Sequence, residues 1–221
     1  MLSRQAGVPE EWVRGVVNGG PASYTLLRRL GPALGLHAAE VFTLAGEEVP
    51  DACATVDPRA GRLVPDLVRQ AMKLSPDGIR ALRGFVASLP QEKPPTPASV
   101  TVPYAGATGP GALLMRLVHN RNLGLGSVAK TFALLTGRYW SAATYGVLAR
   151  GGKDVTADLL ADFAAVLGVA APDLAALTGA LACEAPATAA AAGLGELIWD
   201  VRRLTTDQMR RTVDLAGSLR R

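Results

Sequence analysis

The sequence has few of the residues that build catalytic or metal-binding sites. It contains two cysteines, Cys53 and Cys183, which are too few for a disulfide framework and lack the nearby ligands of a zinc site. Its two histidines, His37 and His119, are far apart, and no Ser-His-Asp, Cys-His or phosphate-loop pattern is present. We therefore expect neither an enzyme nor a protein that holds a metal or another cofactor.

Long apolar runs are also missing. Asp173 and Glu184 interrupt the alanine-rich region near the C-terminus, so no segment reaches the roughly 18 uncharged residues that span a membrane. Glu10 and Glu11 fall where the apolar core of a secretory signal would continue. The sequence therefore predicts a cytoplasmic protein with no membrane contact, and 49% apolar with 19% charged residues is typical of a globular chain.

Acidic residues are absent from one long tract, residues 111–153, although the whole chain carries a net charge of only +4. The tract contains six basic residues: Arg116, Arg121, Lys130, Arg138, Arg150 and Lys153. Acidic residues return at Asp154, Asp158 and Asp162. A polyanion is the commonest partner of such a positive surface, and a solvated basic face without a partner is the other interpretation.

The sequence repeats itself. Residues 33–46, ALGLHAAEVFTLAG, align with residues 166–179, VLGVAAPDLAALTG, and residues 67–89 align with residues 197–219. Both matches keep the same order along the chain, so we interpret the chain as two copies of one helical unit.

Proline and glycine separate the two copies. Residues 91–110 contain too many of these residues to sustain a helix, and we predict a linker there. The predicted domains are therefore residues 1–90 and residues 111–221.

Each copy divides into short amphipathic segments with no convincing strand, which predicts an all-α fold. Ser127 and Ser141 are suitable N-caps, Thr205 with Gln208 forms a capping-box pattern, and Ser75 precedes a proline at the first helical position. Each copy ends in two such helices. We expect these terminal hairpins to pack the copies together or to form a homodimer interface.

Glycines and apolar residues recur at a specific spacing in the first copy, LSRQAGVPEEWVRGVVNGG. Gly7 and Gly19 are twelve residues apart, with Val8, Val13 and Val16 between them. This pattern resembles the helix-turn-helix domain of the Cro/repressor-like (XRE) family, in which the second short helix enters the DNA major groove. The first helix of that family would precede residue 2, so this copy lacks it unless the true start lies upstream.

The second copy resembles the family with a longer turn. Gly137 and Gly151 are fourteen residues apart, but counting back from Gly151 places Ser141 at the N-cap and Tyr145 and Leu148 at buried positions. The resemblance implies tandem lambda-repressor-like units, each followed by a helical hairpin. The second unit is the better candidate for DNA binding, because the first copy is degenerate. Glu10 and Glu11 of the first copy either repel phosphates or stabilise the N-terminus of their own helix.

The resemblance also implies which residues meet DNA. Small side chains at the groove are Ser141, Ala142 and Thr144. Phosphates are expected to meet Lys130, Arg138, Arg150 and Lys153, with further help from Arg116 and Arg121. Tyr139 and Trp140 either contact the DNA backbone or anchor the core, and Arg14 and Asn18 are the candidates in the first unit.

Two functions fit these residues. The first is a transcriptional regulator that binds double-stranded DNA, as a homodimer or with the two units of one chain. The second is a protein-interaction adaptor or antitoxin-like partner whose helix-turn-helix cores contact protein. The acidic start of the first unit and the small helix face of the second favour this alternative.

Overall fold

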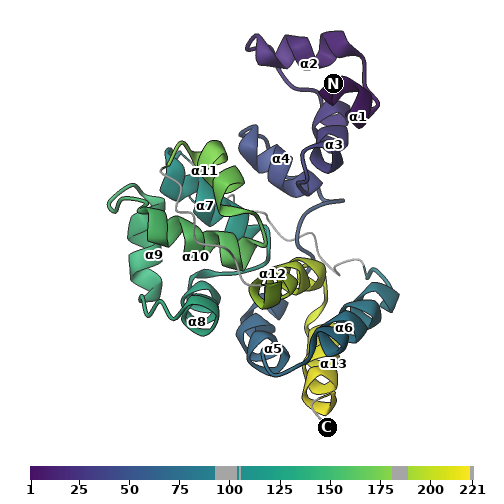
Figure 1. The fold of residues 1–221 in the computed structure, drawn as a ribbon, viewed down its shortest axis with the longest axis vertical. Coiled ribbons are helices and arrows are strands. Elements are labelled where there is room, and N and C mark those ends of the chain that lie inside the picture. The colour runs from purple at the N-terminus through teal and green to yellow at the C-terminus, as the bar shows by residue number, and fades with distance from the viewer. Residues whose placement is uncertain (93–103, 105, 181–188, 220–221) are drawn as a thin grey trace. The chain divides into compact units, whose positions relative to one another are not determined.

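The structure is a computed structural model that describes residues 1–92, 104, 106–180 and 189–219 (Figure 1). These residues form thirteen α-helices and one 3-10 helix, and none of them forms a strand, which confirms the predicted all-α class. The helices group into two compact units: unit 1 over Met1–Ala54 and unit 2 over Thr55–Arg221. Most of the predicted linker lies outside the described residues.

Unit 1 consists of four short helices around a small apolar core. They are α1 (Leu2–Ala6), α2 (Glu10–Val17), α3 (Tyr24–Ala33) and α4 (Ala38–Leu44). α1 ends at Gly7, and α3 begins after Ser23, whose hydroxyl accepts a hydrogen bond from the Leu26 amide. The buried core residues come from α1, α3, α4 and the turn after α1: Ala6, Val8, Leu26, Leu27, Leu30, Val41 and Phe42.

Unit 2 has a central group of five helices with a hairpin before it and a hairpin after it. The leading part is the 3-10 helix η1 (Ala60–Leu63), α5 (Val64–Ala71) and α6 (Pro76–Ser88). The central helices are α7 (Pro110–His119), α8 (Leu125–Thr136), α9 (Ala142–Ala149), α10 (Ala157–Leu167) and α11 (Ala171–Thr178). The last two are α12 (Ala189–Val201) and α13 (Thr206–Ser218). One buried apolar core runs through all these parts.

The described residues contain no single helix that is long and apolar enough to cross a membrane. Only α10 and α11 taken together reach such a length, and the chain bends by 114° between them.

Three of the four predicted N-caps are confirmed. Ser75, Ser141 and Thr205 each accept a hydrogen bond from a backbone amide of the first turn, and Thr205 forms the capping box with Gln208. The prediction at Ser127 is wrong, because α8 begins earlier, after Gly124. Ser127 is buried inside the first turn, where its hydroxyl donates to the carbonyl of Gly61 at 2.9 Å.

Helix ends recur at matching positions in the two halves of the chain. Gly35 and Gly46 follow α3 and α4 with φ of 67° and 74°, and Gly168 and Gly179 follow α10 and α11 with φ of 68° and 67°. A positive φ is open to glycine and costly for other residues. The order of helices from α1 to α6 therefore matches the order from α8 to α13, and α7 has no counterpart among the described helices of unit 1.

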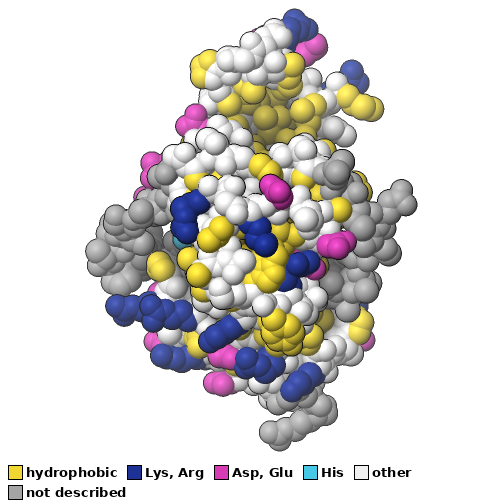
Figure 2. Space-filling view, turned by 90° about the vertical axis from the view of Figure 1, so that its left-hand side faces the viewer, with side chains coloured by type: hydrophobic (Ala, Val, Ile, Leu, Met, Phe, Trp, Pro, Cys, Tyr) yellow, Lys and Arg dark blue, Asp and Glu magenta, His cyan; other side chains and the backbone are white. Residues whose placement is uncertain are grey.

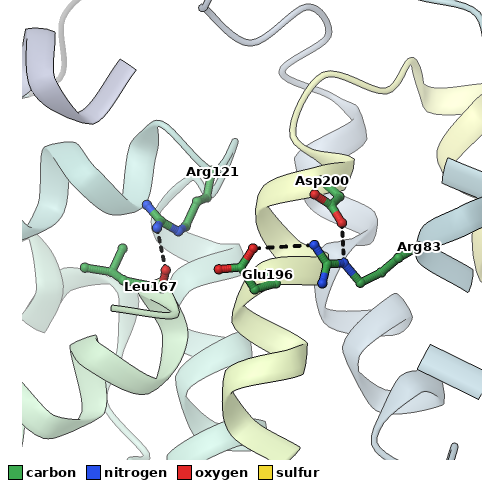
Figure 3. A network of polar contacts seen from close by, with 5 residues as sticks. All are labelled: Arg83, Arg121, Leu167, Glu196 and Asp200. Carbon is green, nitrogen blue, oxygen red and sulfur yellow. Dashed lines mark hydrogen bonds and ion pairs between the residues drawn. The ribbon is translucent and has the colours of Figure 1, made fainter. Parts of the chain in front are cut away.

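The two terminal hairpins pack crosswise on each other. α5 lies against α13, and α6 lies against α12 (Figure 1). Arg83 of α6 bonds to Asp200 of α12 at 2.5 Å and pairs with Glu196 at 3.4 Å (Figure 3). The hairpin of residues 64–88 therefore belongs to unit 2, whereas the sequence assigns it to a domain of residues 1–90. The second hairpin, formed by α12 and α13, buries the apolar face of this first hairpin. The sequence repeat by itself does not predict this pairing.

Close backbone contacts fix the segment before α5. The Asp57 carboxylate accepts hydrogen bonds from the Thr206 amide (2.8 Å) and hydroxyl (2.6 Å), and its carbonyl accepts one from the Asn122 side chain. Burial alone would raise the pKa of Asp57, but the bonds from Thr206 and from the Arg59 amide outweigh it and lower the pKa. A Cβ on Gly61 would lie 1.8 Å from the Asn122 carbonyl oxygen, so only glycine fits there.

Gly61→Ala is expected to lower the free energy of unfolding by roughly 3 kcal/mol, because the added methyl overlaps a backbone oxygen that its neighbours hold in place. Gly84→Ala in α6 is the matched control, since no atom lies within 4 Å of its added Cβ. The control should gain about 0.5–1 kcal/mol. Urea unfolding followed by circular dichroism measures both, and equal stability of the Gly61→Ala variant and the parent would contradict the contact.

Candidate nucleic-acid interface

Most of the candidate residues lie on α8 and α9 or in the segments that flank α9. α9 is anchored by its inward face. Tyr145, Leu148 and Ala149 are fully buried. The Tyr145 ring packs on Phe132 of α8 with the ring centroids 5.0 Å apart. Burial raises the pKa of Tyr145, so its phenol stays neutral. The core therefore sets which side of α9 faces outward.

The outward face of α9 is small and uncharged. Ser141, Ala143 and Val147 are exposed, with 40% of the Val147 surface accessible, and Ala142 and Thr144 are half-buried. The Ser141 hydroxyl accepts from the Thr144 amide and lies 3.0 Å from the Thr144 hydroxyl. Of the candidate residues, Ser141 and Thr144 thus lie side by side at the start of α9, and Ala142 is half-buried.

Tyr139 and Trp140, the two aromatic residues before α9, lie in different environments. Trp140 is half-buried and packs on the core, with its ring centroid 5.6 Å from that of Tyr145. Arg138 and Lys153 both lie over the Trp140 ring, at 5.0 and 4.9 Å from its centroid. Tyr139 is 86% exposed. Trp140 therefore positions two candidate cations, whereas Tyr139 is available to a partner.

The candidate cations differ in how far their charge is already neutralised. Arg138 forms an ion pair with Asp162 of α10, and its side chain is only 23% exposed. Lys130, Arg150 and Lys153 are exposed. Figure 2 shows this side of unit 2, on which Lys and Arg side chains gather among small and apolar ones, with fewer acidic side chains between them. The exposed positive charge around α9 therefore comes from Lys130, Arg150 and Lys153 more than from Arg138.

A shallow cavity of about 440 Å³ lies at the N-terminus of α8. Its lining residues are Pro58, Gly61, Arg62, Gly124, Leu125, Gly126, Ser127 and Lys130. Amides at a helix N-terminus and two nearby cations, Arg62 and Lys130, make this a positive surface. Sequence reasoning missed Arg62, because η1 reaches α8 only through tertiary contacts such as that of Gly61 with Ser127.

The expected help from Arg116 and Arg121 is wrong for Arg121. Its side chain is fully buried and donates to the carbonyls of Leu117, at 3.0 Å, and Leu167 (Figure 3). Its guanidinium lies 5.2 Å from the ring centroid of Trp199. Arg116 is half-buried and donates to the Ala107 carbonyl. Both guanidinium groups donate to backbone oxygens, so the acid-free tract contributes fewer surface cations than its composition indicates.

The candidates of the first copy belong to unit 1. Arg14 is exposed on α2 and pairs with Glu10 at 2.6 Å, and Asn18 follows the end of the same helix, also exposed. Glu10 neutralises the only basic residue of α2. α2 is therefore a less positive surface than α9 with its neighbours.

Arg121→Lys is expected to lower the free energy of unfolding by about 2–4 kcal/mol, because an ammonium cannot reproduce the forked donation of a buried guanidinium. Arg150→Lys is the matched control, since the same change at an exposed position should stay within about 0.5 kcal/mol. Thermal unfolding monitored by circular dichroism compares the two. Similar losses in both variants would mean that the buried hydrogen bonds of Arg121 contribute nothing specific.

Comparisons with protein-family models, with curated proteins and with solved structures found no match to this chain.

Proposed function

We propose that unit 2 binds duplex DNA and regulates transcription, with α8 and α9 acting as a helix-turn-helix of the Cro/repressor-like kind. The observation that carries this proposal is the exposed, uncharged face of α9 beside the exposed cations Lys130, Arg150 and Lys153. A helix with small side chains can approach the floor of the major groove closely. The cations would then meet the phosphates on either side.

The chemistry of α9 favours recognition by shape over recognition by base-edge hydrogen bonds. The hydroxyls of Ser141 and Thr144 are already engaged with each other and with the start of the helix. Ala143 and Val147 offer apolar contact, which suits thymine methyl groups. With few bidentate donors on this face, sequence preference would come largely from groove width and deformability.

The positive N-terminus of α8 supports a second point of phosphate contact. Backbone amides at a helix start favour an anion, and Arg62 and Lys130 line the same cavity. Phosphate contacts there and at Lys153 would set the position of α9 along the duplex without reading its sequence.

The expected homodimer through the terminal helices stays a prediction. Within one chain, α5 with α6 and α12 with α13 already cover parts of each other. A dimer through these helices would have to use their remaining surface, and DNA binding by unit 2 does not require one.

The adaptor function is the second candidate, and a specific observation favours it. Asp162 neutralises Arg138. The exposed carboxylates Asp154 and Asp158 follow Arg150 and Lys153 within a few residues of the sequence. A mixed surface of this kind around an apolar residue such as Val147 also suits a protein partner.

Binding of the full chain to a pool of random duplexes, measured by fluorescence anisotropy across a salt series, separates the two candidates. DNA binding should weaken steeply as salt rises, because neutralised phosphates release counterions. Retention of no duplex at low salt would remove the DNA-binding proposal and leave the adaptor.

Lys130→Ala combined with Lys153→Ala is expected to weaken binding to all duplexes about equally. The slope of log affinity against log salt concentration should become shallower by about 2, since each phosphate contact contributes about 0.9 to this slope. Lys73→Ala, an exposed lysine between α5 and α6, is the control and should leave the slope unchanged. An unaltered slope in the double variant would show that neither lysine meets phosphate.

Asp162→Asn is expected to raise DNA affinity several-fold, because it releases Arg138 from its ion pair and adds a phosphate contact. The slope against salt should steepen by up to about 1. Asp158→Asn changes the net charge equally at an exposed position on the same helix and should have a smaller effect. The same anisotropy assay tests both, and equal effects would assign the gain to overall charge alone.

A further inference from the structure

A cavity of about 780 Å³ lies in unit 2 beside the contact between α6 and α12. From α6 it is lined by Ile79, Arg83 and Ala87, which recur at intervals of four residues and so lie on one side of that helix. From α12 it is lined by Gly193 and Asp200. Its volume is within the range of roughly 300–1,000 Å³ that small-molecule sites occupy. None of the described residues that line it belongs to α8 or α9, so it is separate from the proposed DNA surface.

Two glycines leave this space open. A Cβ added to Gly84 of α6 would have no atom within 4 Å, and one added to Gly193 of α12 would meet only the Cγ2 atom of Ile79, at 3.9 Å. Neither glycine has a positive φ, so the backbone does not require glycine at these positions. Glycine inside a helix lowers stability relative to alanine. The two helices therefore give up some stability at positions where a larger side chain would occupy the cavity.

The rest of the lining is mainly apolar. Its apolar residues are Leu74, Pro76, Ile79, Val86 and Ala87. A ligand with an apolar body would remove this surface from water, which is the main favourable contribution to binding in a site of this kind. The lining therefore favours a largely apolar molecule over a strongly hydrated one.

The charged groups of the lining already have partners of opposite charge. Arg83 of α6 pairs with Asp200 and Glu196 of α12 (Figure 3). Arg80 pairs with Asp77 of its own helix at 2.7 Å. An ionised ligand would lose its hydration here without gaining an unmatched opposite charge from the described residues of the lining. The site is therefore expected to favour an uncharged molecule.

The lining still offers hydrogen-bond donors to such a molecule. The Arg83 guanidinium has five N–H donors, of which Nε bonds to Asp200 and one on Nη2 bonds to Glu196. The side-chain carbonyl of Gln91 accepts from Nε of Arg203 at 3.4 Å, so the amide NH2 group of Gln91 keeps its two donors. A carbonyl or another acceptor on the ligand would match these groups.

We infer that this cavity, which we call the α6–α12 cavity, binds an uncharged and largely apolar small molecule that carries a carbonyl or another hydrogen-bond acceptor. The molecule would lie against both terminal hairpins, since α6 belongs to the first and α12 to the second. It would stabilise the folded chain, because a ligand that binds only the folded state shifts the unfolding equilibrium by mass action. The inference does not depend on DNA binding by unit 2.

Prodan, an uncharged naphthalene that carries a ketone and a dimethylamino group, tests the inference with the full chain in the absence of DNA. Its fluorescence moves to shorter wavelength in an apolar site. We expect saturable binding of about one molecule per chain, with a Kd on the order of 10 μM. Saturation should also raise the midpoint of thermal unfolding, followed by circular dichroism. The anionic probe anilinonaphthalene sulfonate should bind at least about tenfold more weakly.

Gly84→Leu puts a side chain into the α6–α12 cavity and should weaken Prodan binding at least about tenfold, with no rise in the unfolding midpoint. Gly15→Leu in α2 is the matched control, because Gly15 is also an exposed helical glycine whose added Cβ has no atom within 4 Å. Both variants should fold, and the control should bind Prodan as the parent chain does.

Two kinds of result would overturn the inference. The first is failure of Prodan to bind the folded chain, or equal binding by the parent and the Gly84→Leu variant. The second is binding of anilinonaphthalene sulfonate as tight as that of Prodan and lost in Gly84→Leu, which would assign the cavity to an anionic ligand.

Discussion

Unit 2 depends on the burial of apolar side chains at the junction where its two terminal hairpins meet the central helices. One core continues from η1 through α8 and α10 to α13. It closes only because backbones approach without side chains between them, at Gly61 beside Asn122, Gly111 beside Leu148, and Gly195 beside Gly168. Close approach of this kind leaves little room for displacement, because packed interiors resist deformation. The exposed face of α9 is held in place by this closure, since Leu148 is part of it.

Burial also decides which cations can act at the surface. Arg121 donates to backbone carbonyls inside the core, and Arg138 is neutralised by Asp162. Lys130 and Lys153 keep exposed charges, and the ammonium of Lys153 makes a cation–π contact with the Trp140 ring. A net positive tract in the sequence thus separates into structural cations and surface cations. Only the second class can take part in the proposed phosphate contacts.

The two units share an order of helices but differ in what covers them. α9 is buried on its inner side by α7 and α8, whereas α2 has only α1 as its main neighbour. The difference changes the role that each unit can have. A well-covered helix can present a rigid face to a groove, whereas α2 leaves the apolar residues Trp12 and Val17 exposed. Unit 1 also has more carboxylates than arginines, which suits a protein contact better than a phosphate one.

The sequence by itself determined the local features of this protein. The all-α class, the N-caps at Ser75, Ser141 and Thr205, and the inward direction of Tyr145 and Leu148 follow from periodicity and from short-range hydrogen bonds. Only the tertiary structure decided the pairing of the hairpins, the burial of Arg121, the ion pair of Arg138 and the nearness of Arg62 to Lys130. Each of these joins residues from different helices, and Arg62 and Lys130 come from opposite sides of the predicted linker. Local spacing carries no information on such contacts, because they depend on which helices pack against each other in the folded chain.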